Sequence, residues 1–418
     1  MVATSTSIRE KNHMSTQLLK TLTDEVIVLN RGNLDHLLGT LIFLAWSNDT
    51  CNKNHLMQLA ISLALDLRLN KPLIDEGGHK FARMVACGLG VPSEVHTLEQ
   101  RRAVLGCFFL SSWFAFPLAI LHFEASADIE QDFNFSWKNR SLAMDPTADQ
   151  ALTFVKMDEH LRVIEDSKDC IADERFAIQI RTQLLLHRSC QMRDFESEHS
   201  HSSKMPSAFY VKALQSELHD LSASIPSHLQ QDTTIMSGYH YAEMSIHERA
   251  YPVDKSLSCS MTGPQHLQCI CTCLSAIKSF IDILFSMPQA GYLAMPLQFR
   301  IQCMRSLVSL YRLSIYEDPG WDTKAVRNTV DIMAVFDRII IGMEQRSAEI
   351  EDPEDDATIN VYKVMKGFRA FCSTKLAPGE ALVDGSNCLA MNDLDQYPQF
   401  MDLTDDLWLQ DVVGWSTY

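Results

Sequence analysis

The sequence predicts an all-α protein with a disordered acidic C-terminal tail, and two observations carry this prediction. Apolar residues recur three and four positions apart over most of the first 345 residues, which is the spacing of one face of an α-helix. No stretch shows a convincing strand pattern. Residues 376–418 differ in composition, because they contain no Lys or Arg and eight acidic residues.

The composition favours a globular protein and disfavours direct binding to nucleic acid. The chain has 418 residues, of which 46% are hydrophobic and 21% charged, as in ordinary globular proteins. A formal net charge of −17 disfavours binding to a polyphosphate such as DNA. Arg101 and Arg102 form the densest basic feature, and ion-paired or solvated helix residues explain them better than a ligand site.

Three helices are expected to pack as one unit in the first part of the chain. The first begins at Leu34, capped by Asn33, and the second, Leu56 to Leu69, is apolar on most sides and is expected to be a central, buried helix. Thr97 and Gln100 form a capping-box pattern that opens the third at Leu98. Pro117 is expected to kink or end that helix.

These helices carry a resemblance to a known family. The segments LDHLLGTLIFLAW from Leu34, LMQLAISLALDLRLN from Leu56 and EQRRAVLGCFFLSS from Glu99 resemble the middle homology region of fungal binuclear zinc-cluster transcription factors. Residues 213–229 and 239–248 show a weaker similarity to the same region of that family. The resemblance covers roughly residues 20–345 and implies a multi-helix regulatory domain without known catalysis.

The zinc cluster of that family is not found in this sequence. Such a cluster needs repeated cysteine pairs with two residues between them, and none of the twelve cysteines has this spacing. We therefore expect no direct sequence-specific DNA binding, and either a truncated gene model or action through a DNA-binding partner protein. The first fifteen residues are polar and form no secretory signal, so reduced cysteines inside the cell are expected.

The rest of the chain reads as further helices and loops. Asp145 and Pro146 predict a helix start, Asp173 is expected to cap another helix, and Pro264 opens the most regular one, which ends before Pro288. Other helices are expected near residues 209–221, 297–313, 326–343 and 361–371. The predicted organisation is a flexible N-terminus (1–19), the regulatory domain (20–345, with a polar loop at 194–207), an acidic loop and short helix (346–375), and the tail (376–418).

Three other interpretations of the sequence are less favoured. Residues 103–121 have nearly the length of a membrane span, but Pro117 and the charges that follow favour a buried helix, so no membrane partner is expected. His266, Cys269 and Cys273 share one helix face, and His199 and His201 lie close together, yet core or surface roles explain both sets better than a metal site. The main enzyme motifs are absent, which predicts a non-enzymatic protein with no cofactor.

The tail carries the predicted contact site. Its apolar residues alternate with acidic ones, as in disordered activation segments that fold on a coactivator groove. Leu403, Leu407 and Trp408 are the candidate coactivator contacts. The alternative is a C-terminal helix that docks onto its own domain. The resulting hypothesis is a nuclear transcriptional regulator of a fungal metabolic or biosynthetic gene set, acting on the transcription machinery, and the alternative is a helical scaffold or inhibitor that titrates a full-length relative.

Overall fold

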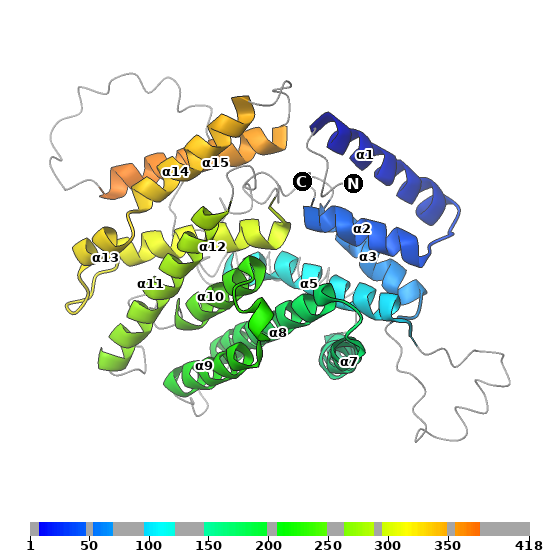
Figure 1. The fold of residues 1–418 in the computed structure, drawn as a ribbon, viewed down its shortest axis with the longest axis horizontal. Helices are drawn as coiled ribbons and strands as arrows, with labels where there is room; N and C mark the ends of the chain where they lie inside the picture. The colour runs from blue at the N-terminus through cyan, green and yellow to red at the C-terminus, as the bar shows by residue number, and fades with distance from the viewer. Residues whose placement is uncertain are drawn as a thin grey trace.

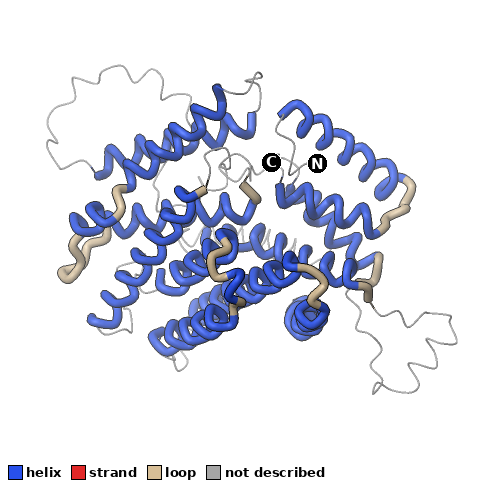
Figure 2. Tube along the Cα trace, in the orientation of Figure 1, coloured by secondary structure: helices blue, strands red, loops and turns tan. Residues whose placement is uncertain are grey.

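The structure is a computed structural model that describes residues 8–46, 53–69, 96–121, 146–198, 207–248, 263–287, 295–348 and 356–376. Helices, turns and loops make up these residues, and they contain no strand (Figures 1 and 2). The all-α prediction is therefore confirmed. Nearly all of the predicted tail lies outside the described residues, so its disorder stays a prediction.

The helices follow one another along the chain with short connections where the structure describes them. Their bounds are α1 (Ile8–Thr21), the π-helix η1 (Leu22–Val28), α2 (Leu34–Trp46), α3 (Lys53–Asp66), α5 (Leu98–Leu121), α7 (Pro146–Ser167), α8 (Ile171–Glu198), α9 (Ser207–Ser224), the 3₁₀-helix η2 (Ser227–Leu229), α10 (Thr233–His247), α11 (Gly263–Ser286), α12 (Leu297–Ile315), α13 (Thr323–Thr329), α14 (Ile332–Ala348) and α15 (Asp356–Leu376).

The three predicted helices at the start of the chain pack together as α2, α3 and α5. Asn33 Oδ1 accepts a hydrogen bond from the His36 amide at 2.9 Å, which satisfies a free donor at the start of α2. The capping box of α5 is also present, since the Gln100 side chain accepts from the Thr97 amide at 2.9 Å and the Thr97 hydroxyl accepts from the Gln100 amide at 3.2 Å. Both predicted helix starts are confirmed.

The centre of the fold is α12, not the predicted second helix. α12 contacts α2, α5, α10, α11, α13, α14 and α15, and it crosses the middle of the molecule in Figure 1. α3 contacts α2 and α5 at one side, and its Leu65 is 39% exposed. The prediction was wrong because α12 contains buried polar residues, among them Gln302 and Arg305. Polar residues in a sequence normally indicate a solvent-exposed face, so the sequence of α12 did not indicate a central helix.

Several polar side chains of α12 form hydrogen bonds or ion pairs inside the fold. The hydroxyls of Ser306 and Ser314 donate to the carbonyls four residues earlier, at 2.8 and 2.7 Å. Arg305 pairs with a carboxylate of α10, described below. The helix can therefore be buried on all sides without an apolar surface on all sides.

α11 packs along α10 and α12 in the second half of the chain. Its predicted inner face is buried, including Ile270, Ile277 and Leu284. Within the described residues, α11 is the one helix whose length and composition would allow it to cross a membrane, and 44% of its most apolar window is buried inside the fold. In the alternative span that begins at Ala103, the part up to Trp113 has most of its side chains in the core.

The C-terminal helices differ from the prediction of one helix over residues 326–343. Two helices, α13 and α14, occupy this region. The backbone is extended at Val330, which ends α13, and Asp331 caps α14 by accepting from the amides of Met333 and Ala334. α15 is longer than predicted and packs on α14 and α12. Its Phe368 and Cys372 join the same core as the N-terminal Leu22.

Three further predictions need correction. The N-terminal segment predicted to be flexible contains α1, which contacts α2 and places Leu18 against the core. Pro117 does not end α5, which continues for four residues beyond it; the expected kink stays a prediction. α8 runs to Glu198, so the first five residues of the predicted polar loop are helical.

Candidate functional site

The predicted coactivator contacts, Leu403, Leu407 and Trp408, lie outside the described residues, as do His199 and His201. The structure therefore does not test them. Asp145 and Pro288 also lie outside the described residues. The structure does place the two arginines, Asp173 and the His266 face of α11, and it reveals a polar cleft that the sequence did not indicate.

Arg101 and Arg102 at the start of α5 are engaged within the fold. Arg101 is 3% exposed, donates to the His96 carbonyl at 3.3 Å, and lies 3.1 Å from His160 Nδ1. Arg102 donates to both carboxylate oxygens of Asp173, at 2.8 and 2.7 Å. The interpretation of this pair as ion-paired helix residues is confirmed.

Asp173 was expected to be a helix cap, and this prediction was wrong. Asp173 is the third residue of α8, which begins at Ile171, so it lies inside the first turn and not at the cap position. Its carboxylate faces Arg102. The hydrogen bonds from Arg102 hold the pKa of Asp173 below its ordinary value. The role of Asp173 is to join α8 to α5.

The predicted face of His266, Cys269 and Cys273 is also found in α11. All three are buried, whereas Cys271 between them is exposed, as the helical geometry predicts. His266 Nε2 lies 3.0 Å from the Tyr316 hydroxyl. Among the described residues, no group of three or more His, Cys, Asp or Glu side chains is arranged to hold a metal ion.

A buried ionic cluster joins α10 to α12. Glu248, the residue after α10, accepts from Arg305 at 2.8 Å and from the Ser309 hydroxyl at 2.5 Å, and Arg312 lies 3.8 Å away. Burial alone would raise the pKa of Glu248, but the two guanidinium groups and these hydrogen bonds lower it below its ordinary value. The carboxylate is therefore ionised and holds the two helices together.

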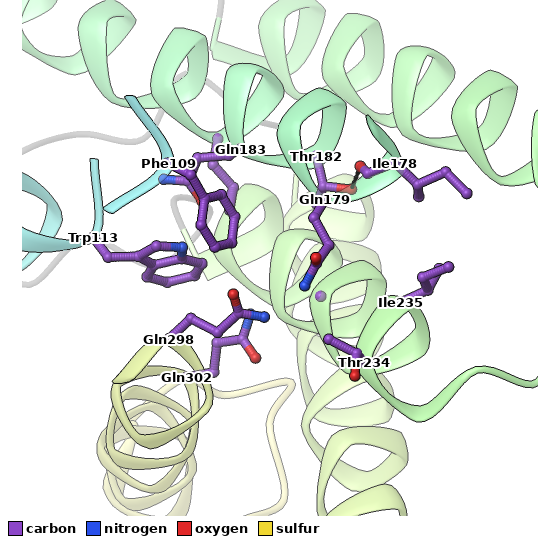
Figure 3. Close-up of a pocket in the computed structure, with 12 residues that line it drawn as sticks. Phe109, Trp113, Ile178, Gln179, Thr182, Gln183, Thr234, Ile235, Gln298 and Gln302 are labelled. Carbon is purple, nitrogen blue, oxygen red and sulfur yellow. Dashed lines mark hydrogen bonds between the residues drawn. The ribbon is translucent and has the colours of Figure 1, made fainter. Parts of the chain in front are cut away.

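A polar cleft opens where α5, α8, α10 and α12 meet (Figure 3). Phe109 and Trp113 of α5 form an aromatic wall, with their ring centroids 6.2 Å apart. Gln298 and Gln302 extend from α12 beneath Trp113, and Gln179 faces them from α8. The space open to the centre of a water molecule is about 10 Å³.

The described side chains that line this cleft are all uncharged: Phe109, Trp113, Ile178, Gln179, Thr182, Gln183, Leu186, Thr234, Ile235, Gln298 and Gln302. The sequence did not reveal the site, because its residues are spread over nearly two hundred positions. A buried glutamine in an otherwise ordinary helical pattern gives no sign of what it faces. The one sequence signal is a pair of glutamines, Gln298 and Gln302, four positions apart in an otherwise helical apolar pattern.

Comparison with known proteins agrees with the family resemblance. A family model described as the ATEG07667_C C-terminal domain matches residues 289–418. The chain is 28% identical over 404 residues to a protein named transcription factor opdL from Penicillium oxalicum, covering 91% of this chain and 66% of that protein. It is 29% identical over 292 residues to a protein named transcription factor from Aspergillus terreus, covering 63% of this chain.

The chain thus spans about two thirds of the first relative and 49% of the second. Neither name describes an enzyme. No solved structure matches the chain. The predicted resemblance to a fungal transcription factor family is confirmed by these similarities.

Proposed function

We propose that this chain is a non-enzymatic transcriptional regulator that acts in the nucleus and controls a fungal metabolic or biosynthetic gene set. The observation that carries the proposal is the similarity to a fungal transcription factor over 91% of the chain. The helical domain supplies the regulatory part. The tail, with its alternating acidic and apolar residues, supplies the contact with a coactivator or the transcription machinery.

The physical argument for the tail rests on its charge. Eight carboxylates without a Lys or Arg repel one another, which keeps the segment open and its apolar groups in water. An apolar groove with a basic rim on a coactivator can then take Leu403, Leu407 and Trp408 as one face of a short helix.

A reporter assay tests this proposal in the full chain. Residues 1–418 are fused to an unrelated DNA-binding domain, and we expect activation that falls sharply when Leu403, Leu407 and Trp408 are all changed to Ala. The matched control replaces Leu382, Val383 and Leu389, which lie in the same tail, and should retain activation. An inactive parent fusion would favour a tail docked on its own domain and would remove the activator proposal.

The same assay addresses the alternative of a helical inhibitor. A chain that fails to activate, but lowers activation by a co-expressed full-length relative, would be an inhibitor that titrates its partner. Transcript profiling after deletion of the gene would then identify the genes that it controls.

We further propose that contact with specific DNA sequences comes from a partner protein. The formal net charge of −17 opposes binding to phosphate, and Arg101 and Arg102 are already engaged within the fold. The purified chain should bind duplex DNA weakly and without sequence preference in fluorescence anisotropy at physiological salt. Tight, sequence-selective binding would contradict this.

A further inference from the structure

We propose that a groove between α8 and α9 is a docking site for a basic peptide segment of a partner protein, in which apolar and positively charged side chains alternate. We call this surface the acidic groove. Residues of α8 from Glu174 to Arg188 line one wall, residues from Glu217 to Pro226 line the other, and Glu165 of α7 borders it. The proposal rests neither on the role of the tail nor on the proposed control of transcription.

The first observation is the size and shape of the acidic groove. Its volume is about 580 Å³, which lies in the range of sites that bind ligands. Figure 1 shows α8 and α9 side by side, and the lining residues of α8 from Glu174 to Arg188 cover a length of about 20 Å. An extended peptide of about six residues has the same length. A long, open groove of this kind fits a segment of chain better than a compact small molecule.

The second observation is the apolar part of the lining. Ile178 of α8, Leu221 of α9 and Pro226 after it all line the groove and are half-buried, so each keeps some apolar surface in contact with water. Covering this surface with apolar side chains of a partner is favourable. A small hydrated cation would leave the same surface in water, so the occupant needs apolar groups as well as charge.

The third observation is the charge of the lining, which has four carboxylates and two guanidinium groups: Glu165, Glu174, Glu217, Asp220, Arg181 and Arg188. Both guanidinium groups are engaged. Arg181 donates to both carboxylate oxygens of Glu165 at 2.6 Å, and Arg188 lies 2.8 Å from Glu217. Glu174 lies 2.9 Å from the His228 ring, and Asp220 is exposed and pairs with none of the described residues. The groove therefore has an excess of negative charge that its own arginines do not neutralise.

These observations together define the chemistry of the occupant. Successive side chains of an extended peptide point to opposite sides, so a peptide that alternates apolar and basic residues can cover the apolar lining and place its cations beside Glu174 and Asp220. The formal net charge of −17 adds attraction at longer range, whereas an acidic peptide would be repelled. Because the carboxylates are near solvent, salt should weaken the contact.

Fluorescence anisotropy with the full chain and three labelled peptides tests this proposal. The probe alternates Lys and Leu over seven positions, beginning and ending with Lys; one control peptide has Ser in place of Leu, and the other has Glu in place of Lys. At about 50 mM salt, the Lys-Leu peptide should bind at least about tenfold more tightly than the Lys-Ser peptide, and the Glu-Leu peptide should not bind. Equal binding of both Lys peptides, or displacement of the probe by an equal concentration of spermidine, would show attraction to any cation and overturn the proposal.

Variants locate the binding site. Arg188→Gln removes a positive charge and frees the Glu217 carboxylate, so it should tighten binding of the Lys-Leu peptide about threefold. A loss of folding cannot produce such a gain. Asp220→Lys reverses an exposed charge of the groove and should weaken binding about tenfold.

Asp66→Lys is the matched control. It makes the same change of charge at an exposed position of α3 that does not line the groove, and it should bind the peptide as the parent does. Circular dichroism confirms that each variant is folded. Unchanged affinity in folded Arg188→Gln and Asp220→Lys, or an equal loss in Asp66→Lys, would place the peptide elsewhere on the chain and refute the site.

Discussion

The Arg102 guanidinium donates to both carboxylate oxygens of Asp173, and the two residues stand 71 positions apart in the chain. This bidentate pair joins the N-terminal part of α5 to the first turn of α8. Asp169 accepts a further hydrogen bond from Arg102 at 2.6 Å. The two carboxylates differ in burial, since the side chain of Asp173 is 5% exposed and that of Asp169 is 54% exposed.

Asp173→Asn should lower the free energy of unfolding by about 2 kcal/mol, because a charged, largely buried hydrogen-bonded pair is lost. Asp169→Asn changes a carboxylate that contacts the same arginine but is exposed to solvent. It should therefore cost less than about 1 kcal/mol. Urea unfolding of both variants and the parent makes the comparison. Equal losses would mean that burial does not set the strength of this contact.

The same pair predicts a dependence on pH. The hydrogen bonds from Arg102 lower the pKa of Asp173 in the folded state, whereas an unfolded aspartate has a pKa of about 4. The pair therefore adds stability above that pH, and this stability is lost as the pH falls through the lower folded pKa. In Asp173→Asn this part of the acid dependence should disappear from urea unfolding curves measured between about pH 5 and pH 2.

Leu63→Asp should leave little soluble protein. Leu63 is 1% exposed on α3, and a buried carboxylate without a partner costs several kcal/mol, a large share of a total stability of roughly 5 to 15 kcal/mol. Leu65→Asp changes the same residue type two positions away, where the side chain is 39% exposed, and should be tolerated. Soluble yield and thermal unfolding of the two variants check the prediction, which fails if both behave alike.

Glu248→Gln should destabilise the protein by about 3 kcal/mol. The change leaves the buried Arg305 and the partly buried Arg312 without their carboxylate, and breaking one side of a buried ion pair typically has this cost. Glu165→Gln removes a half-exposed partner of Arg181 and should cost less than about 1 kcal/mol. If chemical denaturation gave the same loss for both variants, Glu248 would not hold α10 to α12 as described.

Alkylation should distinguish neighbouring cysteines of α11. Cys271 is exposed and should react with iodoacetamide within minutes at about pH 8, whereas burial raises the pKa of Cys273 well above its ordinary value and keeps its thiol from the reagent. Peptide mass spectrometry reads the labelling, and a urea-unfolded sample in which both cysteines react is the control. Rapid labelling of Cys273 in the native chain would show that this face of α11 opens to solvent.

Local signals in the sequence determined where many helices begin. The capping box of Thr97 and Gln100, the cap at Asn33 and the proline at position 146 each act within about one turn of chain, so a reader of the sequence can recognise them. The periodic spacing of apolar residues fixed the helical class for the same reason. The buried face of α11 could likewise be predicted from its own residues.

Tertiary structure alone decided which helix lies at the centre and where the polar residues go. Arg305 can be buried because Glu248 faces it from 57 positions away, and Asp173 joins two helices because Arg102 is near it only in the fold. The cleft at Gln183 and Gln302 exists for the same reason, since four helices must meet to form it. The free energy of burying a polar group depends on its partner, and a sequence does not state which distant residue that partner will be.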